Sequence, residues 1–426
     1  MNKRTKTTLR RWCLYGWTLA KWTMAASAIG VVCGLIGTMF HFGVHEVTAF
    51  RGTHPWVLYL LPLAGFVIVS FYKLTETDGL GTDDIIDAVH AGKRLPILLL
   101  PAIFFGTVLT HLCGGSAGRE GAALQMGGTI GQCMGRTFRL DDRDLRVATL
   151  AGMAAFFSAL FGTPLAATVF AIMVISIGVL YHVALYPSLL AALVAYGVSV
   201  RLGVEPTRFT VAVPDQSVGM FVRVAALGVL CALVSILFCK LMHGAGHLMK
   251  RIKNPWLRVI CGGFAVIALT WVFGTDYNGA GMDIVTRAIE QETVAVPWAF
   301  LLKLVFTAVT LAAGFKGGEV VPSFFVGATF SCAVSPLLGL PVGFGAAVGL
   351  AAVFCGVTNC PVASTLLAVE LFGAEGMLYF ALACCLSYML SGYQGLYSSQ
   401  TILYSKLKAQ FINVHTNAYH AGEKTE

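Results

Sequence analysis

Residues 118–131 read GREGAALQMGGTIG, and residues 317–331 read GGEVVPSFFVGATFS. Each stretch is a glycine-glutamate junction, centred on Glu120 or Glu319, followed by an apolar segment that contains further glycines. Two more pairs of similar stretches occur, one before and one after this pair in each half of the chain. TDGLGTDDII at 77–86 resembles TDYNGAGMDIV at 275–285, and FGTPLAATVFAI at 161–172 resembles VTNCPVASTLLAVEL at 357–371. Three ordered matches, each offset by nearly 200 residues, predict two halves related by an internal repeat.

The composition indicates that water is not the main solvent of this chain. Of its 426 residues 57% are hydrophobic and only 12% are charged, about half the charged share of a soluble domain. Several apolar runs are long enough to cross a bilayer as helices, which predicts an all-α polytopic membrane protein in contact with lipid. The runs are 22–40, 55–71, 95–112, 221–241, 257–273 and 296–313.

Basic residues flank the first and last apolar runs. They are Lys3, Arg4, Lys6, Arg10, Arg11, Lys21, Lys406, Lys408 and Lys424. The excess of basic residues on cytoplasmic flanks predicts that both termini are cytoplasmic. We attribute the net charge of +8 to this topology and expect no nucleic-acid partner, because the basic residues flank membrane segments and form no basic face with stacking residues.

The predicted organisation has four parts. Residues 1–21 form a cytoplasmic amino-terminal segment, 22–202 and 203–408 the two halves of the membrane domain, and 409–426 a cytoplasmic tail. Each matched stretch contains a glycine or proline break, and the apolar segment after it is predicted to be only about 10 to 16 residues long, shorter than a full span. Non-helical backbone is tolerated at membrane depth only inside protein or beside an aqueous cavity, so the breaks should converge on a pathway.

The breaks have the chemistry of an anion site. The first amides of a helix lack intrahelical partners, and the helix dipole makes that end partly positive. Glycine lets an ion approach such amides closely. The predicted anion contacts at the two opposed helix starts are Gly118, Gly121, Gly318 and Val320.

Glu120 is the predicted gate at the first of these helix starts. Its carboxylate can occupy the anion position when ionised and leave it when protonated, which couples anion and proton movement. The alternative is an ordinary acid that favours a helix start, worth a few tenths to about 1 kcal/mol. Ionisable residues inside membranes are costly and usually functional, which favours the gate. For Arg119 we favour a structural role in anchoring the loop over direct anion binding.

Other chemistries are less well supported by the sequence. GGSAG at 114–118 fits the nucleophile elbow of a serine hydrolase around Ser116, but that motif requires a preceding strand and 95–112 has the pattern of a membrane helix. The pairs His41 with His45 and His243 with His247 have helical spacing without a third ligand, so we interpret them as core or interfacial histidines. The twelve cysteines contain no CxxC pair, and no disulfide, metal or cofactor is expected.

The GREG string, the paired GGEVVP segment and the terminal GLYSS at 395–399 resemble the CLC family of chloride channels and proton-coupled anion antiporters. The resemblance covers about Trp22 to Lys408. It implies an inverted repeat of two halves whose broken helices meet at a central anion site. In that family the glutamate of the GREG string is the gate, which assigns this role to Glu120. A tyrosine near the carboxyl end lines the anion site, which assigns that role to Tyr397.

Departures from the ordinary family pattern point to one branch. Leu80 stands where a serine is usual in the first break, and residues 172–174 read IMV where chloride antiporters carry an internal proton-transfer glutamate. Glu319 and the TNCPVAS string around Asn359 are also atypical. These features resemble bacterial fluoride/proton antiporters, which are homodimers with one pathway in each subunit. The resemblance implies a transporter, not an enzyme, in the bacterial inner membrane that exports fluoride in exchange for protons, with Leu80 beside the anion.

Glu319 is predicted to take part in proton coupling. Fluoride holds its water tightly, so a site that strips it needs compact donors such as helix-start amides or a protonated carboxyl. A bound anion next to Glu319 would favour the protonated form of its carboxyl, which could then carry a proton. The rival is an ion pair with Lys316 that gives Glu319 a structural role. Two other functions stay open: a chloride channel or chloride/proton antiporter of the same fold, and an intramembrane serine hydrolase.

Overall fold

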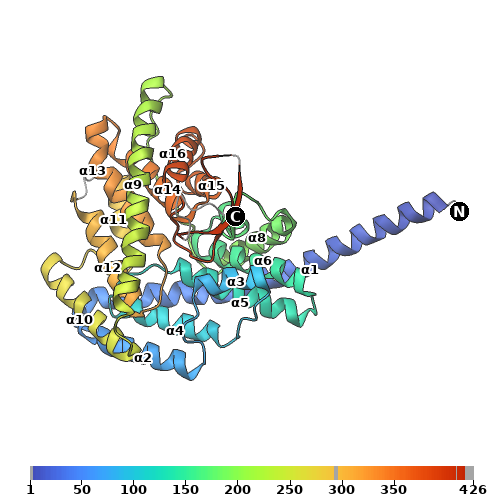
Figure 1. The fold of residues 1–426 in the computed structure, drawn as a ribbon, viewed down its shortest axis with the longest axis horizontal. Coiled ribbons are helices and arrows are strands. Elements are labelled where there is room, and N and C mark those ends of the chain that lie inside the picture. Colours follow the sequence, from blue (N-terminus) through green and yellow to red (C-terminus); the bar gives the residue numbers. More distant parts are fainter. Residues whose placement is uncertain (1–2, 292–295, 409, 418–426) are drawn as a thin grey trace.

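The structure is a computed structural model that describes residues 3–291, 296–408 and 410–417; of residues 3–10 only the backbone is described. Over these residues the chain forms sixteen α-helices, two short 3₁₀ helices and three short strands (Figure 1). The last part of the predicted tail, 418–426, lies outside the described residues.

The helices divide equally between the two predicted halves. The first half contains α1 (Lys3–Thr53), α2 (Leu61–Leu74), α3 (Thr82–Ala91), α4 (Leu99–Leu112), α5 (Glu120–Thr137), α6 (Asp142–Phe161), α7 (Pro164–Met173) and α8 (Leu185–Arg201). The second contains α9 (Val218–Met249), α10 (Pro255–Phe273), α11 (Met282–Glu290), α12 (Ala299–Ala313), α13 (Val320–Leu338), α14 (Val342–Thr358), α15 (Pro361–Phe372) and α16 (Met377–Leu390). The 3₁₀ helices are Pro55–Leu60 and His182–Ala184.

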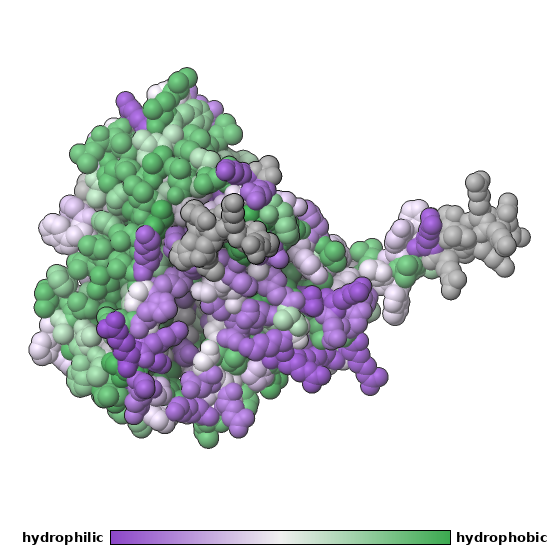
Figure 2. Space-filling model, in the orientation of Figure 1, coloured by the Kyte–Doolittle hydropathy of each residue, from purple (hydrophilic) through white to green (hydrophobic). Residues whose placement is uncertain are grey.

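Seven helical segments of the described chain are long and apolar enough to cross a membrane. Hydrophobic residues cover much of the surface around α9 and α10 (Figure 2), where Leu233, Phe264 and Trp271 are exposed. Apolar residues exposed on the outside of a helical bundle are what contact with lipid tails requires. The predicted all-α membrane fold is therefore confirmed.

The internal repeat is visible in the backbone itself. The residues before α5 and α13 have nearly the same conformation, with φ −107° and ψ −9° at Arg119 and φ −94° and ψ −13° at Glu319. Thr163 before α7 and Cys360 before α15 agree even more closely, with φ −121° and ψ 71° against φ −119° and ψ 70°. The helices after the GREG and GGEVVP breaks are longer than expected, with 18 and 19 residues.

Local chemistry explains why α7 and α15 begin where they do. Pro164 and Pro361 each occupy the first turn, where a missing N–H costs no helix bond. The carboxylate of Glu370 on α15 accepts the amides of Leu165 and Ala166, at 3.0 and 2.8 Å. One half of the molecule thus caps a helix of the other half.

Close packing holds α5 against α6. A Cβ on Gly127, Gly131 or Gly152 would lie 2.0–2.3 Å from a backbone oxygen of the facing helix. Small residues at helical spacing let membrane helices approach this closely. The glycine-rich segment after Glu120 therefore fixes the position of α5 and of the break at its start.

The part of the fold that was not predicted is a small sheet near the carboxyl end. Strand β2 (Thr401–Tyr404) pairs in parallel with β1 (Ser176–Ile177) and antiparallel with β3 (Phe411–His415). It joins the segment between α7 and α8 of the first half to the end of the second half. The predicted boundary at 21/22 also has no structural counterpart, because α1 continues through it.

Candidate anion pathway

The two glutamate breaks meet at the centre of the molecule. The amide of Gly118 donates to the carbonyl of Gly318, and the amide of Gly318 donates to the carbonyl of Gly118, both at 2.7 Å. We call this pair of bonds the glycine bridge. Because both amides are used in it, the predicted anion contacts Gly118 and Gly318 have no free amide, and the amides left at the helix starts are those of the residues that follow, which include Gly121 and Val320.

Glu120 lies between the two helix starts. Its Oε2 accepts the amide of Arg119 at 2.9 Å, and the amides of Glu120 itself and of Val321 on α13 also face its carboxylate. The side chain is only 1% exposed. A carboxylate held by amides from both halves occupies the kind of position that a free anion would take at paired helix starts.

Glu319 lies on the other side of the glycine bridge, in a cavity of about 320 Å³ that we call the inner cavity. Its Oε2 is 3.2 Å from the place where a Cβ on Gly121 would lie, so it approaches the start of α5. Lys316 makes no ion pair within 4.0 Å among the described residues. Its Nζ lies instead 4.1 Å from the ring centroid of Tyr72, so the ion pair between Lys316 and Glu319 does not form.

Tyr397 and Leu80 line the same inner cavity as Glu319. Tyr397 is 2% exposed, so it is not an interfacial anchor, and its hydroxyl has no hydrogen-bond partner among the described residues. A buried hydroxyl without a partner costs about 1–3 kcal/mol, so this donor is left available for an ion.

The segment that carries Tyr397 is held by polar contacts that the sequence did not reveal, although it singled out Asn359 as atypical. Asp83 at the first break accepts the amide of Ser399 at 2.9 Å. Asn359 ends α14 with φ 62° and donates to the carbonyl of Gln394. Lys406 bonds the side-chain oxygen of Asn359 and the carbonyl of Tyr388.

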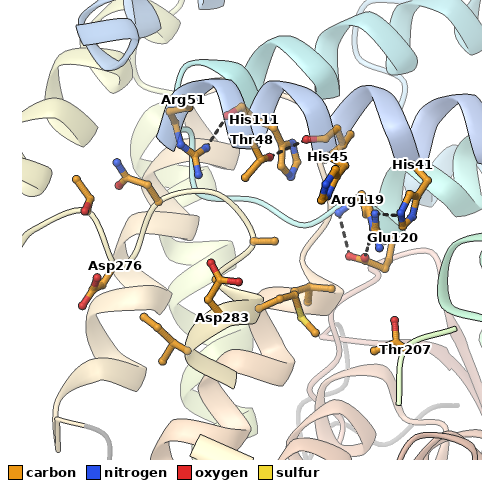
Figure 3. Close-up of a pocket in the computed structure, with 18 of the residues that line it drawn as sticks. His41, His45, Thr48, Arg51, His111, Arg119, Glu120, Thr207, Asp276 and Asp283 are labelled. Carbon is orange, nitrogen blue, oxygen red and sulfur yellow. Dashed lines mark hydrogen bonds and ion pairs between the residues drawn. The ribbon is translucent and has the colours of Figure 1, made fainter. Parts of the chain in front are cut away.

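Glu120 faces a second cavity of about 400 Å³, which we call the outer cavity (Figure 3). Here Arg119 connects Glu120 to α1. Its Nε is 3.6 Å from Oε1 of Glu120, and its Nη1 donates to Nδ1 of His41 at 3.0 Å. The rings of His41 and His45 stack at 6.4 Å. A loop-anchoring role for Arg119 was expected from the sequence, but its partner His41 was not.

The first break of each half opens into a different cavity. Residues 79–84 line the inner cavity, whereas their counterparts 280–284 line the outer one. Each carboxylate also belongs to a different cavity, Glu120 to the outer and Glu319 to the inner. Equivalent elements on opposite sides of a central plane are the mark of an inverted repeat.

The geometry does not support the hydrolase alternative. Helix α4, not a strand, precedes Ser116, whose Oγ lies 3.0 Å from Oγ1 of Thr307 while its amide donates to Thr310. A nucleophile elbow needs a strand before the serine and a histidine beside it. Among the described residues no group of three or more His, Cys, Asp or Glu is arranged to hold a metal ion.

Comparisons with known proteins agree with this architecture. A "Chloride/fluoride channel protein" of Pseudomonas syringae pv. tomato is 38% identical over 400 residues, which are 91% of this chain and 88% of that protein. An "H(+)/Cl(-) exchange transporter ClcA" of Vibrio campbellii is 24% identical over 382 residues, 81% of each chain. A solved structure of "a CLC-type fluoride/proton antiporter" superimposes with a TM-score of 0.88 at 32% identity, covering 91% of this chain and 99% of that one. Residues 63–392 match the family described as voltage gated chloride channel. The chain therefore belongs to the CLC family of anion channels and antiporters.

Proposed function

We propose that this protein exports fluoride in exchange for protons and thereby protects the cell from fluoride. The observation that carries the proposal is the pair of acids on the two sides of the glycine bridge, Glu120 in the outer cavity and Glu319 in the inner one. The similar "Chloride/fluoride channel protein" and "CLC-type fluoride/proton antiporter" support the choice of ion. The protein acts as a transporter, without a catalysed reaction.

Glu120 couples the two ions by competing for the anion position. Ionised, its carboxylate is stabilised by three backbone amides, of which that of Arg119 donates a hydrogen bond of 2.9 Å. Hydrogen bonds to an ionised acceptor are roughly twice as strong as neutral ones, so protonation weakens all three together. The neutral side chain then leaves, and an anion takes the amides. Return of the carboxylate displaces the anion and releases the proton.

Glu319 supplies the proton route that residues 172–174 lack. In the inner cavity a bound fluoride would lie near the Glu319 carboxyl, the Tyr397 hydroxyl and Leu80. Negative charge on the ion favours the protonated carboxyl, which then donates a short hydrogen bond to it. Compact donors of this kind match the smallest halide better than larger ones. The anion and the proton thus share one site on this side.

The setting that we propose is the bacterial inner membrane, with both termini cytoplasmic and two subunits that each contain a complete pathway. The basic residues before α1 support this orientation. With the start of α1 in the cytoplasm, its far end, which carries His41 and Arg51, reaches the opposite face. The outer cavity then opens away from the cytoplasm and the inner cavity opens toward it.

A chloride channel or chloride/proton antiporter is the second candidate, supported by the similarity to the exchangers of the ClcA type. Purified protein in proteoliposomes separates the two. We expect efflux of fluoride with opposed movement of protons, measured with a fluoride electrode and a pH electrode. Chloride flux equal to fluoride flux, or fluoride flux without protons, would contradict the proposal. Ser116→Ala should transport normally, because no reaction depends on that hydroxyl.

A further inference from the structure

The contact between α1 and the gate is the strongest feature that the proposed function does not use. Three side chains form a chain in the outer cavity: His41 of α1, Arg119 and Glu120 (Figure 3). The Arg119 guanidinium has only donors, so Nδ1 of His41 must accept the hydrogen bond of 3.0 Å between them. His41 is therefore neutral here, with its own proton on Nε2.

We propose that neutral His41 is a positioning residue that shares Arg119 with Glu120, and that its protonation tightens the hold of Arg119 on the gate and slows transport. This proposal rests on the proposed gating role of Glu120. It adds a sensor of acidity in the outer cavity to the exchange itself.

The sign of the effect follows from the donors and charges. A proton on Nδ1 of His41 removes the acceptor and places a second positive charge beside Arg119. The guanidinium can no longer bond His41, so its donors turn to Glu120, whose Oε1 is already 3.6 Å from Nε. Two cations beside the carboxylate favour its ionised form, in which it stays on the helix-start amides. The gate opens only when the Glu120 carboxylate is protonated and leaves these amides.

Other charged groups face the same cavity and must be separated from His41. The titratable and charged residues there are His45 on α1, His111 on α4, Asp276 and Asp283 and Arg287 around α11, and Arg51 at the end of α1. His45 stacks on His41 without a hydrogen bond to Arg119 in the described structure. His45 is therefore the matched control, since it lies in the same cavity but not in the chain of contacts.

His41→Asn is the decisive variant. The Oδ1 atom of asparagine is as many bonds from Cβ as Nδ1 of histidine, so it can accept from Arg119, but it does not titrate. His41→Phe keeps the size and removes the acceptor. Uptake into proteoliposomes should be measured with equal pH on both sides, from about pH 8 down to about pH 3.5.

We expect wild type and His41→Asn to agree at high pH, and wild type to become about twofold slower than His41→Asn, or slower still, at the acidic end, where His41 gains its proton. His41→Phe should be slow at every pH, and His45→Asn should follow wild type. Parallel profiles of wild type and His41→Asn, or equal flattening by His45→Asn, would overturn the proposal; if His41→Phe fails to fold, the asparagine variant still decides. Absence of coupled fluoride flux in the wild type refutes the proposed function instead, and the comparison is then made with the anion that the protein does carry.

Discussion

Glu120 and Glu319 each lie against the helix start of the opposite half. The carboxylate of Glu120, the first residue of α5, faces the amide of Val321 on α13, and Oε2 of Glu319, the residue before α13, lies close to Gly121 on α5. The crossing places one acid on each side of the glycine bridge. An ion that passes the centre must therefore displace or touch both acids in turn.

Glu120→Gln should abolish proton-coupled exchange. The amide side chain keeps the shape of the acid but has no ionised state, so it neither competes with the anion as a charge nor carries a proton. We expect anion movement without opposed proton movement, or no movement at all, in the electrode assay. Glu375→Gln, which changes an exposed acid outside both cavities, is the control. Intact coupling in Glu120→Gln would remove Glu120 from the mechanism.

Glu319→Gln and Glu319→Ala should differ from each other. Glutamine can still donate to a bound fluoride but cannot exchange a proton, so fluoride binding persists while fluoride-driven proton flux is lost. Alanine removes the donor as well, and a hydrogen bond to a charged group contributes about 1.5–3 kcal/mol, so fluoride affinity should fall at least about tenfold. Binding calorimetry and proton flux measure the two effects separately. Wild-type values of both in the alanine variant would show that Glu319 is only structural.

Tyr397→Phe should weaken fluoride binding by about tenfold without lowering thermal stability. The hydroxyl has no partner in the described structure, so its removal breaks no internal bond. Removal of the hydroxyl therefore reduces only the favourable free energy of fluoride binding. Unchanged fluoride affinity in a stable variant would mean that the hydroxyl does not reach the anion.

Gly318→Ala should prevent the two breaks from meeting. A Cβ there would lie 2.2 Å from the backbone nitrogen of Gly121, and neither main chain can yield without breaking the glycine bridge. Overpacking of this kind costs about 1–3 kcal/mol or more, so we expect a lower melting temperature and loss of transport. Gly246→Ala is the control, because no atom lies within 4 Å of its added Cβ. A fully active Gly318→Ala would contradict the close approach.

Lys406→Met should loosen the segment that carries Tyr397. It leaves the side-chain oxygen of Asn359 and the carbonyl of Tyr388 without their buried donor, at about 1–3 kcal/mol for each unsatisfied group. We expect a lower melting temperature together with weaker fluoride binding. Asn359→Gly keeps the left-handed backbone at φ 62° and removes the side chain, so it should show the same pair of losses. Loss of stability with normal binding would separate the network from the ion site.

The sequence was sufficient for the repeat and for the helix starts at the two glutamate breaks, because these depend on local features. The match of Glu120 to Glu319 was wrong by one residue: the structure pairs Gly118 with Gly318, so Glu319 is equivalent to Arg119 before its helix, whereas Glu120 is the first residue of α5.

Closeness in sequence was misleading for Lys316. Its place three residues before Glu319 suggested an ion pair between the two, yet the break at Gly317 and Gly318 turns the Lys316 side chain toward Tyr72 on α2.

Long-range contacts between polar residues were the part that could not be predicted. His41 is 78 positions from Arg119, and Lys406 is 47 from Asn359. Neither separation follows from the repeat of a helix or a strand, because such pairs are brought together by the packing of whole helices. The same reason applies to the small sheet, whose strand of two residues, Ser176–Ile177, is too short for an alternating pattern to be recognised.

The glycine bridge also determines where a membrane voltage acts. A cavity approaches it from each side, so the insulating layer is thinnest between Glu120 and Glu319. Most of the potential then falls over this short distance, and one elementary charge that crosses it gains or loses up to about 2.3 kcal/mol per 100 mV. An outward anion and an inward proton move charge in the same electrical direction. A negative interior therefore drives both steps of the exchange at the single place where the two halves touch.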